Sequence, residues 1–157
     1  MARQTPRMNT DANHRTRLKN LHELVDRYVA LWNEPDPDVR RKLIHELWAP
    51  DGAQVLVDPP EEVRDVADRL KFSIPPLEVH GYDALEARVT RAHEMFVAPG
   101  AYVFEPGGNV SRPLSNVISF TWTMTARADG ERAGGGLDVL AISTDGRIRT
   151  DYQFIGA

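Results

Sequence analysis

The sequence predicts an α+β fold in which the helices come first and the strands come last. Apolar residues recur at helical spacing in three segments before Gly100, and they alternate with polar residues after it. Strands grouped after helices favour a sheet with the helices packed on one of its faces. We therefore expect a curved, cone-shaped sheet, antiparallel or mixed, with three main helices on its concave face.

Turn signals bound the expected helices. The first helix ends at "NEPDPD" (33–38), and its apolar stripe consists of Leu18, Leu21, Val25, Tyr28 and Trp32. Asp36 is then expected as an N-cap with Pro37 in the first helical position, opening a second helix that includes Trp48 and stops at "APDG" (49–52). A short strand, 54–57, follows. The third helix should begin at Gly81, after a 59–80 insertion that holds one short charged helix and a proline-broken loop.

The strands after Gly100 end in a hairpin whose register can be predicted. Its two strands, "LDVLAIS" and "IRTDYQFI", are joined through Asp145-Gly146, which is a strong hairpin signal. A two-residue loop would place Arg149, Asp151 and Gln153 on the same face as Leu140 and Ile142. A three-residue loop with Gly146 in the left-handed conformation would instead place Ile148, Tyr152 and Phe154 on that face, and we expect this second register. This register puts Asp138 on the apolar inner face, opposite Tyr152.

Length and composition indicate one domain, 17–157, behind a disordered tail, 1–16. The chain has 157 residues, of which 41% are hydrophobic, so it can bury one core. A net charge of −4 without a dominant basic face argues against nucleic acid as a partner. No apolar run approaches the roughly 18 residues that span a membrane, and no secretory h-region is present, so we expect a cytoplasmic protein. Cysteine is absent and the histidines lack ligand spacing, so we expect no metal and no cofactor.

Two acids fall on surfaces that should be buried. Asp58 follows the apolar strand in "QVLVDPP" (54–60), and Asp138 interrupts an apolar strand, where an unpaired charge would cost several kcal/mol. Tyr28 lies on the buried stripe of the first helix. For Asp58 and Tyr28 a structural interpretation is open, in which Asp58 caps a turn and Tyr28 is a core aromatic.

Three segments resemble the nuclear transport factor 2-like superfamily, which includes ketosteroid isomerases and SnoaL-like polyketide cyclases. They are "RYVALWNEPD" (27–36), "VLVDP" (55–59) and "GLDVLAISTDGRI" (136–148). The resemblance implies that Asp58 is a general base, and that Tyr28 and a protonated Asp138 stabilise an enolate oxygen. It also implies a cone-shaped cavity, around which we expect Trp32, Phe72, His93, Phe120, Trp122, Leu140 and Tyr152 as substrate-binding residues.

These residues favour a cofactor-independent acid/base isomerase or cyclase that acts on a small hydrophobic carbonyl compound. The alternatives are a non-catalytic protein that binds a small hydrophobic ligand, and an interaction module whose cavity is filled by side chains. Epoxide hydrolysis would need an arginine between two acids, and we find no inward-facing arginine in the strands. We expect a homodimer through the outer sheet face, which carries the row Ser119, Thr121, Thr123 and Thr125.

Replacing Asp58 tests its expected role as the base. Asp58→Asn preserves volume and shape, so it should lower turnover about 10²–10⁴-fold while leaving the fold and ligand affinity nearly intact. Steady-state rates and calorimetric melting would be measured on the same samples. An Asn variant with full activity would remove Asp58 from the catalytic residues.

Overall fold

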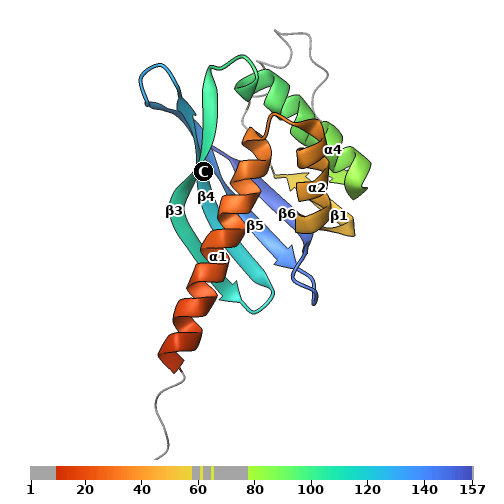
Figure 1. The fold of residues 1–157 in the computed structure, drawn as a ribbon, viewed down its shortest axis with the longest axis vertical. Coiled ribbons are helices and arrows are strands. Elements are labelled where there is room, and N and C mark those ends of the chain that lie inside the picture. The colour runs from red at the N-terminus through yellow and green to blue at the C-terminus, as the bar shows by residue number, and fades with distance from the viewer. Residues whose placement is uncertain (1–9, 58–60, 62–64, 66–77, 157) are drawn as a thin grey trace, which may run out of the picture.

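A computed structural model (Figure 1) describes residues 10–57, 61, 65 and 78–156. The helices are α1 (Thr10–Asn33), α2 (Pro37–Leu47) and α4 (Gly81–Ala92), and α4 continues into the π-helical segment η1 (His93–Val97). The strands are β1 (Trp48–Leu56), β2 (Glu78–His80), β3 (Tyr102–Leu114), β4 (Val117–Ala126), β5 (Arg132–Ile142) and β6 (Ile148–Ile155).

The six strands form one mixed sheet, in the order β2-β1-β6-β5-β4-β3. β1 runs parallel to β6, and the other neighbouring pairs are antiparallel. Figure 1 shows α1, α2 and α4 on the same face of this curved sheet. The predicted α+β class and the placement of the helices are therefore confirmed.

The first helix begins earlier than expected. α1 starts at Thr10, so residues 10–16 are helical rather than part of a disordered tail. The segment from Thr10 to Asn33 contains neither glycine nor proline, and a helix propagates through such a segment once it has nucleated.

The second helix begins as predicted but ends earlier. Asp36 Oδ1 accepts a hydrogen bond from the Asp38 backbone N–H at 2.9 Å, and Pro37 occupies the first turn. Trp48 has extended dihedral angles and begins β1, so the expectation that it ends a helix is wrong. A side chain at Gly52 would bring its Cβ within 2.8 Å of the Trp48 ring, and glycine therefore allows β1 to fold closely past that indole.

The 59–80 segment is described in part. Glu78–His80 form β2, which pairs antiparallel with β1, and Val79 is buried. The expected proline-broken loop therefore ends in a short edge strand. Asp58, Phe72 and the expected extra helix, apart from Glu61 and Asp65, lie outside the described residues.

A side-chain amide fastens the end of α1 to the far edge of the sheet. Asn33 Nδ2 donates to the Phe104 carbonyl at 2.7 Å, and the Phe104 N–H donates to Asn33 Oδ1 at 2.8 Å. The amide thus pairs with the backbone of β3 as a neighbouring strand would. These two hydrogen bonds fix the end of α1 against β3.

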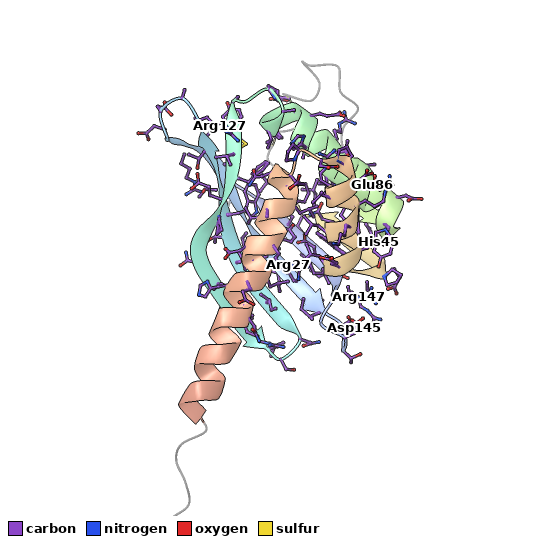
Figure 2. All side chains as sticks on the ribbon, viewed as in Figure 1. Arg27, His45, Glu86, Arg127, Asp145 and Arg147 are labelled. Carbon is purple, nitrogen blue, oxygen red and sulfur yellow. The ribbon has the colours of Figure 1, made fainter. Side chains whose placement is uncertain are left out.

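The core lies between α1, α2, α4 and the concave face of the sheet. Trp48, Leu31, Ile44, Leu140 and Ile148 are fully buried there. Charged side chains lie around the rim, where Arg27 pairs with Glu46 and Arg147 with Asp145 (Figure 2). Among the described helices, none combines the length and the apolar character that crossing a membrane requires.

We predict that Asn33→Ala lowers the free energy of unfolding by about 1–3 kcal/mol, because the backbone groups of Phe104 lose both partners. Urea unfolding followed by tryptophan fluorescence would measure the change. Asn109→Ala, at an exposed position of the same strand, is the control and should change stability by less than about 0.5 kcal/mol. Equal effects of the two substitutions would contradict the anchoring role of Asn33.

Candidate functional site

Three ionisable side chains meet inside the core. Tyr28 Oη lies 2.7 Å from Asp138 Oδ2 and 2.5 Å from Asp151 Oδ2. Both carboxyl groups are completely buried, and Tyr28 is 2% exposed. We call Tyr28, Asp138 and Asp151 the acid cluster; its members come from α1, β5 and β6.

Asp151 reaches the cluster because the pairing of β6 with β5 contains a register shift that the sequence does not predict. The predicted hairpin loop is present, with Gly146 at φ +83° and the Ser143 N–H donating to the Arg147 carbonyl at 2.8 Å. Ile148 therefore faces inward opposite Ile142, as predicted. A second shift follows, because Ala141 pairs with Thr150 and Leu140 with Asp151.

This second shift corrects the predicted register. One extra residue between Ile148 and Asp151 turns the rest of β6 over, so that Asp151 is buried and Tyr152 is 42% exposed. Tyr152 pairs with Val139, and Gln153 is the residue opposite Asp138. The predicted position of Tyr152, on the inner face beside Asp138, is therefore wrong.

The proton count of the cluster requires a neutral carboxylic acid. A phenol has one proton, and it can be donated to only one of the two carboxyl oxygens at hydrogen-bond distance. The other short contact needs a proton from an aspartic acid. At least one of Asp138 and Asp151 is thus protonated whenever the cluster has this geometry.

Neutral donors surround the acid cluster. Trp122 Nε1 donates to Asp138 Oδ1 at 2.7 Å, and Gln54 Nε2 donates to Asp151 Oδ2 at 2.9 Å. Gln153 Nε2 lies 3.4 Å from both oxygens of Asp138. Among the described residues, the buried Asp151 Oδ1 has no hydrogen-bond partner.

Burial dominates the electrostatics of the site. It raises the pKa of Asp151 well above its usual value, and the negative charge of Asp138 raises it further. Burial also raises the pKa of Asp138, although hydrogen bonds from Asp151, Tyr28 and Trp122 oppose that change. The pKa of Tyr28 lies well above its usual value because of burial and the two adjacent acids, so its hydroxyl stays protonated.

Helix α4 supplies an arginine next to the cluster. Arg88 Nη1 donates to Gln54 Oε1 at 3.4 Å, which orients the Gln54 amide so that its NH2 group faces Asp151 and Tyr28. Burial lowers the pKa of Arg88, and electrostatic interactions with Asp151 and Tyr28 oppose this change. Arg88 lies on α4, so the alternation of side chains along the strands does not predict it.

Solved structures share this architecture over most of the chain. A protein of Agrobacterium tumefaciens, provisionally named an isomerase of the SnoaL-like family, is 24% identical and has a TM-score of 0.68, over 88% of this chain and 99% of that one. An NTF2-like protein of unknown function from Exiguobacterium is 19% identical, with a TM-score of 0.57, over 84% and 97% of the two chains. The chain has the nuclear transport factor 2-like fold.

A provisionally named polyketide cyclase of Sinorhizobium meliloti also has the nuclear transport factor 2-like fold, at 17% identity and a TM-score of 0.53, over 83% of this chain and 93% of that one. No protein-family model matches the sequence. No curated protein matches it either. These likenesses show the fold, and the chemistry has to be argued from the side chains.

Within the nuclear transport factor 2-like fold, three aromatic side chains pack around Tyr28. The Phe120 ring packs edge-on against it at a centroid distance of 4.9 Å, and the Trp48 ring lies at 5.6 Å. Trp32 lies beyond at 6.2 Å, and the buried Leu140 is the cross-strand partner of Asp151. Of the predicted site residues, Trp32, Phe120, Trp122 and Leu140 are therefore grouped around Tyr28 and Asp138.

His93 occupies a different part of the fold. It begins η1 and is buried, and burial lowers the pKa of its imidazole, with a further contribution from the positive charge of Arg40. Its electrostatic neighbours are Arg40, Glu34 and Glu94 rather than the acid cluster. The predicted roles of Asp58 and Phe72 concern residues outside those described, so both stay predictions.

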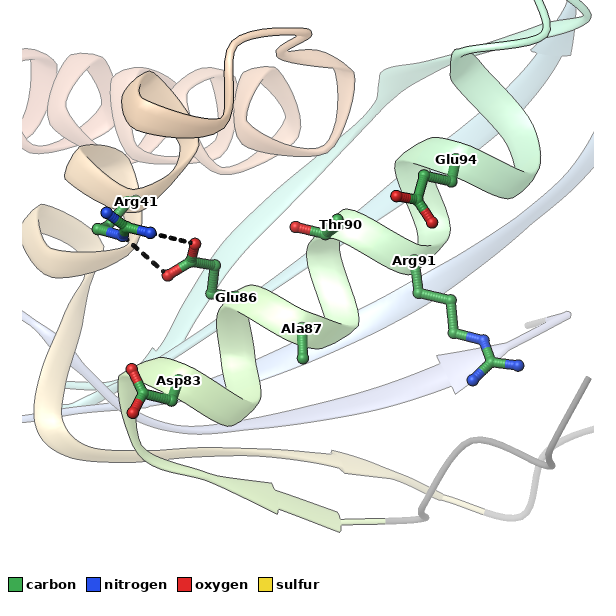
Figure 3. A pocket seen from close by; sticks show the side chains of 7 residues that line it. All are labelled: Arg41, Asp83, Glu86, Ala87, Thr90, Arg91 and Glu94. Carbon is green, nitrogen blue, oxygen red and sulfur yellow. Dashed lines mark hydrogen bonds and ion pairs between the residues drawn. The ribbon is translucent and has the colours of Figure 1, made fainter.

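A charged groove lies along the outer side of α4 (Figure 3). Its lining consists of Arg41, Asp83, Glu86, Ala87, Thr90, Arg91 and Glu94. Arg41 forms two hydrogen bonds with Glu86, at 3.0 and 3.1 Å, and this pair joins α2 to α4 at an exposed position. The charged side chains Arg41 and Glu86 of the groove therefore have a structural role in joining two helices. Exposed ion pairs of this kind contribute little to stability.

We predict that stability decreases as pH rises, because the folded chain holds a proton that the unfolded chain releases. The unfolded carboxyl groups titrate near 4, whereas burial raises the pKa of Asp151 and Asp138 in the fold. The stabilising contribution is complete below the unfolded pKa and is lost as pH rises through the folded one, at about 1.4 kcal/mol per unit of difference.

Asp151→Asn should flatten this pH dependence, since the amide cannot ionise; urea unfolding between pH 4 and 9 measures it. The control is Asp145→Asn. Hydrogen bonds from Ser143 and Arg147 lower the Asp145 pKa to about 2, so its contribution has the opposite sign and is lost at acidic pH. An unchanged profile in Asp151→Asn would contradict the raised pKa.

Proposed function

We propose that the acid cluster catalyses proton transfer in a cofactor-independent isomerase or cyclase. The substrate would be a small hydrophobic carbonyl compound. The observation that supports this most strongly is the contact of two completely buried carboxyl groups with one tyrosine hydroxyl. A neutral acid and a carboxylate held this close form an acid/base pair, and burial brings such groups towards the pKa range useful near neutral pH.

The proposed reaction uses one carboxyl group as base and the other as acid. The carboxylate takes a proton from the carbon next to the carbonyl group, and the electron pair moves towards the carbonyl oxygen. The neutral acid returns a proton to another atom of the substrate. A proton then passes from the first carboxyl group to Tyr28 Oη, and the Tyr28 proton passes to the second, which restores the starting state.

Several contacts favour a chemical role over a purely structural one. Asp151 Oδ1 lacks a partner among the described residues, and it can accept a hydrogen bond from a bound ligand without loss of an existing one. The aromatic rings of Phe120 and Trp48 give the surroundings the apolar character that a hydrophobic substrate needs. The names of the A. tumefaciens and S. meliloti proteins are consistent with this class of reaction.

The prediction is that the protein exchanges the carbon-bound protons of an enolisable ketone. 2-Tetralone in D2O is the probe, and NMR measures the loss of its α-proton signals. Tyr28→Phe removes the hydroxyl that links the two acids and should slow exchange about 10²–10⁴-fold. Tyr102→Phe, at a half-buried tyrosine outside the cluster, is the matched control and should retain the rate of the parent protein.

2-Naphthol, a planar mimic of the enolate, reports binding in the same experiment through its fluorescence. Binding of naphthol without exchange of tetralone protons would assign the protein to the non-catalytic ligand-binding class. Tyr28→Phe and Tyr102→Phe with equal exchange rates would overturn the proposed role of the acid cluster.

A further inference from the structure

Gly136, the last glycine of "AGGG" (133–136), leaves room for a side chain that contacts the acid cluster. Gly136 is the direct cross-strand partner of Trp122. A Cβ atom at Gly136 would lie 2.6 Å from Trp122 Cζ2 and 2.8 Å from the Phe154 carbonyl oxygen. The indole therefore lies where a side chain at position 136 would otherwise stand.

The absence of a side chain at Gly136 lets the indole reach the next inward-facing residue of β5. Trp122 Nε1 donates to Asp138 Oδ1 at 2.7 Å. On its other side the indole meets Phe104 edge-on, at a centroid distance of 5.7 Å and an interplanar angle of 78°. Trp122 is thus held between Phe104 and the backbone of β5, with its N–H directed at the acid cluster.

The two carboxyl groups receive unequal sets of donors. Asp138 has the indole N–H of Trp122 on one oxygen, and Gln153 Nε2 lies 3.4 Å from both oxygens. Asp151 has one N–H donor, from Gln54, and its Oδ1 lacks a partner among the described residues. Donors stabilise a carboxylate, whereas an oxygen without a partner costs less on a neutral acid than on an ionised one.

We propose that Trp122, seated over Gly136, is a positioning residue that keeps the negative charge on Asp138 and the shared proton on Asp151. Tyr28 then donates to Asp138 Oδ2 and accepts from Asp151 Oδ2, which satisfies both short contacts. This assignment differs from the family resemblance, which implies a protonated Asp138 and places the general base at Asp58. If the proposed function holds, this charge assignment makes Asp138 the base and Asp151 the acid. The catalytic part of the inference therefore rests on the proposed function.

Tyr28, a neutral phenol, faces both acids from α1. The positive charge of Arg88, on α4, interacts with Asp151 and favours its ionised form, so it opposes the effect of the donors on Asp138. Gln54, Trp122 and Gln153 complete the surroundings as uncharged donors. Burial raises the pKa of both carboxyl groups, so the donors described above decide which of them holds the proton.

NMR titration of the full chain tests the proposal without a substrate. Aspartate is labelled with 13C at Cγ, and Asp138→Asn and Asp151→Asn assign the two carboxyl signals. At pH 7 the Asp138 signal should be that of a carboxylate and the Asp151 signal that of a neutral acid. Trp122→Phe keeps an aromatic ring but loses the N–H, so the midpoint of Asp138 should rise by about one pH unit or more.

Gly136→Ala should raise the Asp138 midpoint in the same way, because the new methyl group displaces the indole. Gly134→Ala is the matched control, since its Cβ would meet only Met124 Cε, at 3.6 Å, and should leave the midpoint unchanged. In a Trp122→Phe background, Gly136→Ala should add no further shift. If Gly136→Ala does not fold, Trp122→Phe alone decides the outcome.

A neutral Asp138 beside an ionised Asp151 in the parent protein would overturn the proposal, and so would a Trp122→Phe variant with an unchanged Asp138 midpoint. The titration and the tetralone assay fail independently. If the titration gives the expected charges on Asp138 and Asp151 but the protein does not exchange the protons of 2-tetralone, only the proposed function is contradicted. Proton exchange with the reversed charge assignment would contradict only the positioning role of Trp122.

Discussion

One tyrosine hydroxyl contacts two buried carboxyl groups, of which at least one must be a neutral acid. The interior of this sheet is arranged around that constraint. Tyr28, Asp138 and Asp151 come from three elements, and Gln54 and Trp122 add donors from two more. A buried carboxyl group without partners is costly, so each of these elements has to arrive in register before the cluster is stable. The close packing of Phe120 and Trp48 around Tyr28 holds that register in place.

Periodicity was sufficient to predict the fold class and part of the cluster. The helical stripe identified Tyr28 as buried, and strand alternation placed Asp138 on the inner face. Both signals depend only on residues close together in the chain. The burial of Asp151 was not predicted, because its orientation depends on the extra residue Arg149, and "IRTD" contains no glycine or proline that would mark such an irregularity. The polar residues Asp151 and Gln153 at alternate positions were the one available signal.

The remaining differences arise from tertiary contacts. Pro50 limits the helix locally to Ala49 at most, and a strand at Trp48 lets Gly52 pass close to the Trp48 ring and lets β1 pair with β6. β2 is too short to be recognised without its partner strand. Arg88 and Gln54 lie far apart in the sequence and meet only because α4 crosses the end of β1. Interactions of this kind override local propensity.

The irregularity at Arg149 has a consequence for how such a chain can diversify. If Arg149 paired with Ala141 instead of remaining the extra residue, β6 would alternate regularly, so that Tyr152 and Phe154 would turn inward while Asp151 and Gln153 turned towards the outer surface. The neighbouring strands would keep their order and their backbone pairing. A change in pairing by a single residue, with no change in the sequence at all, would thus exchange an ionisable lining for an aromatic one. Deleting Arg149 would not have this effect, because Thr150 and Asp151 would keep their partners Ala141 and Leu140 and Asp151 would still face inward. A sequence alignment would therefore hold no record of this change of chemistry.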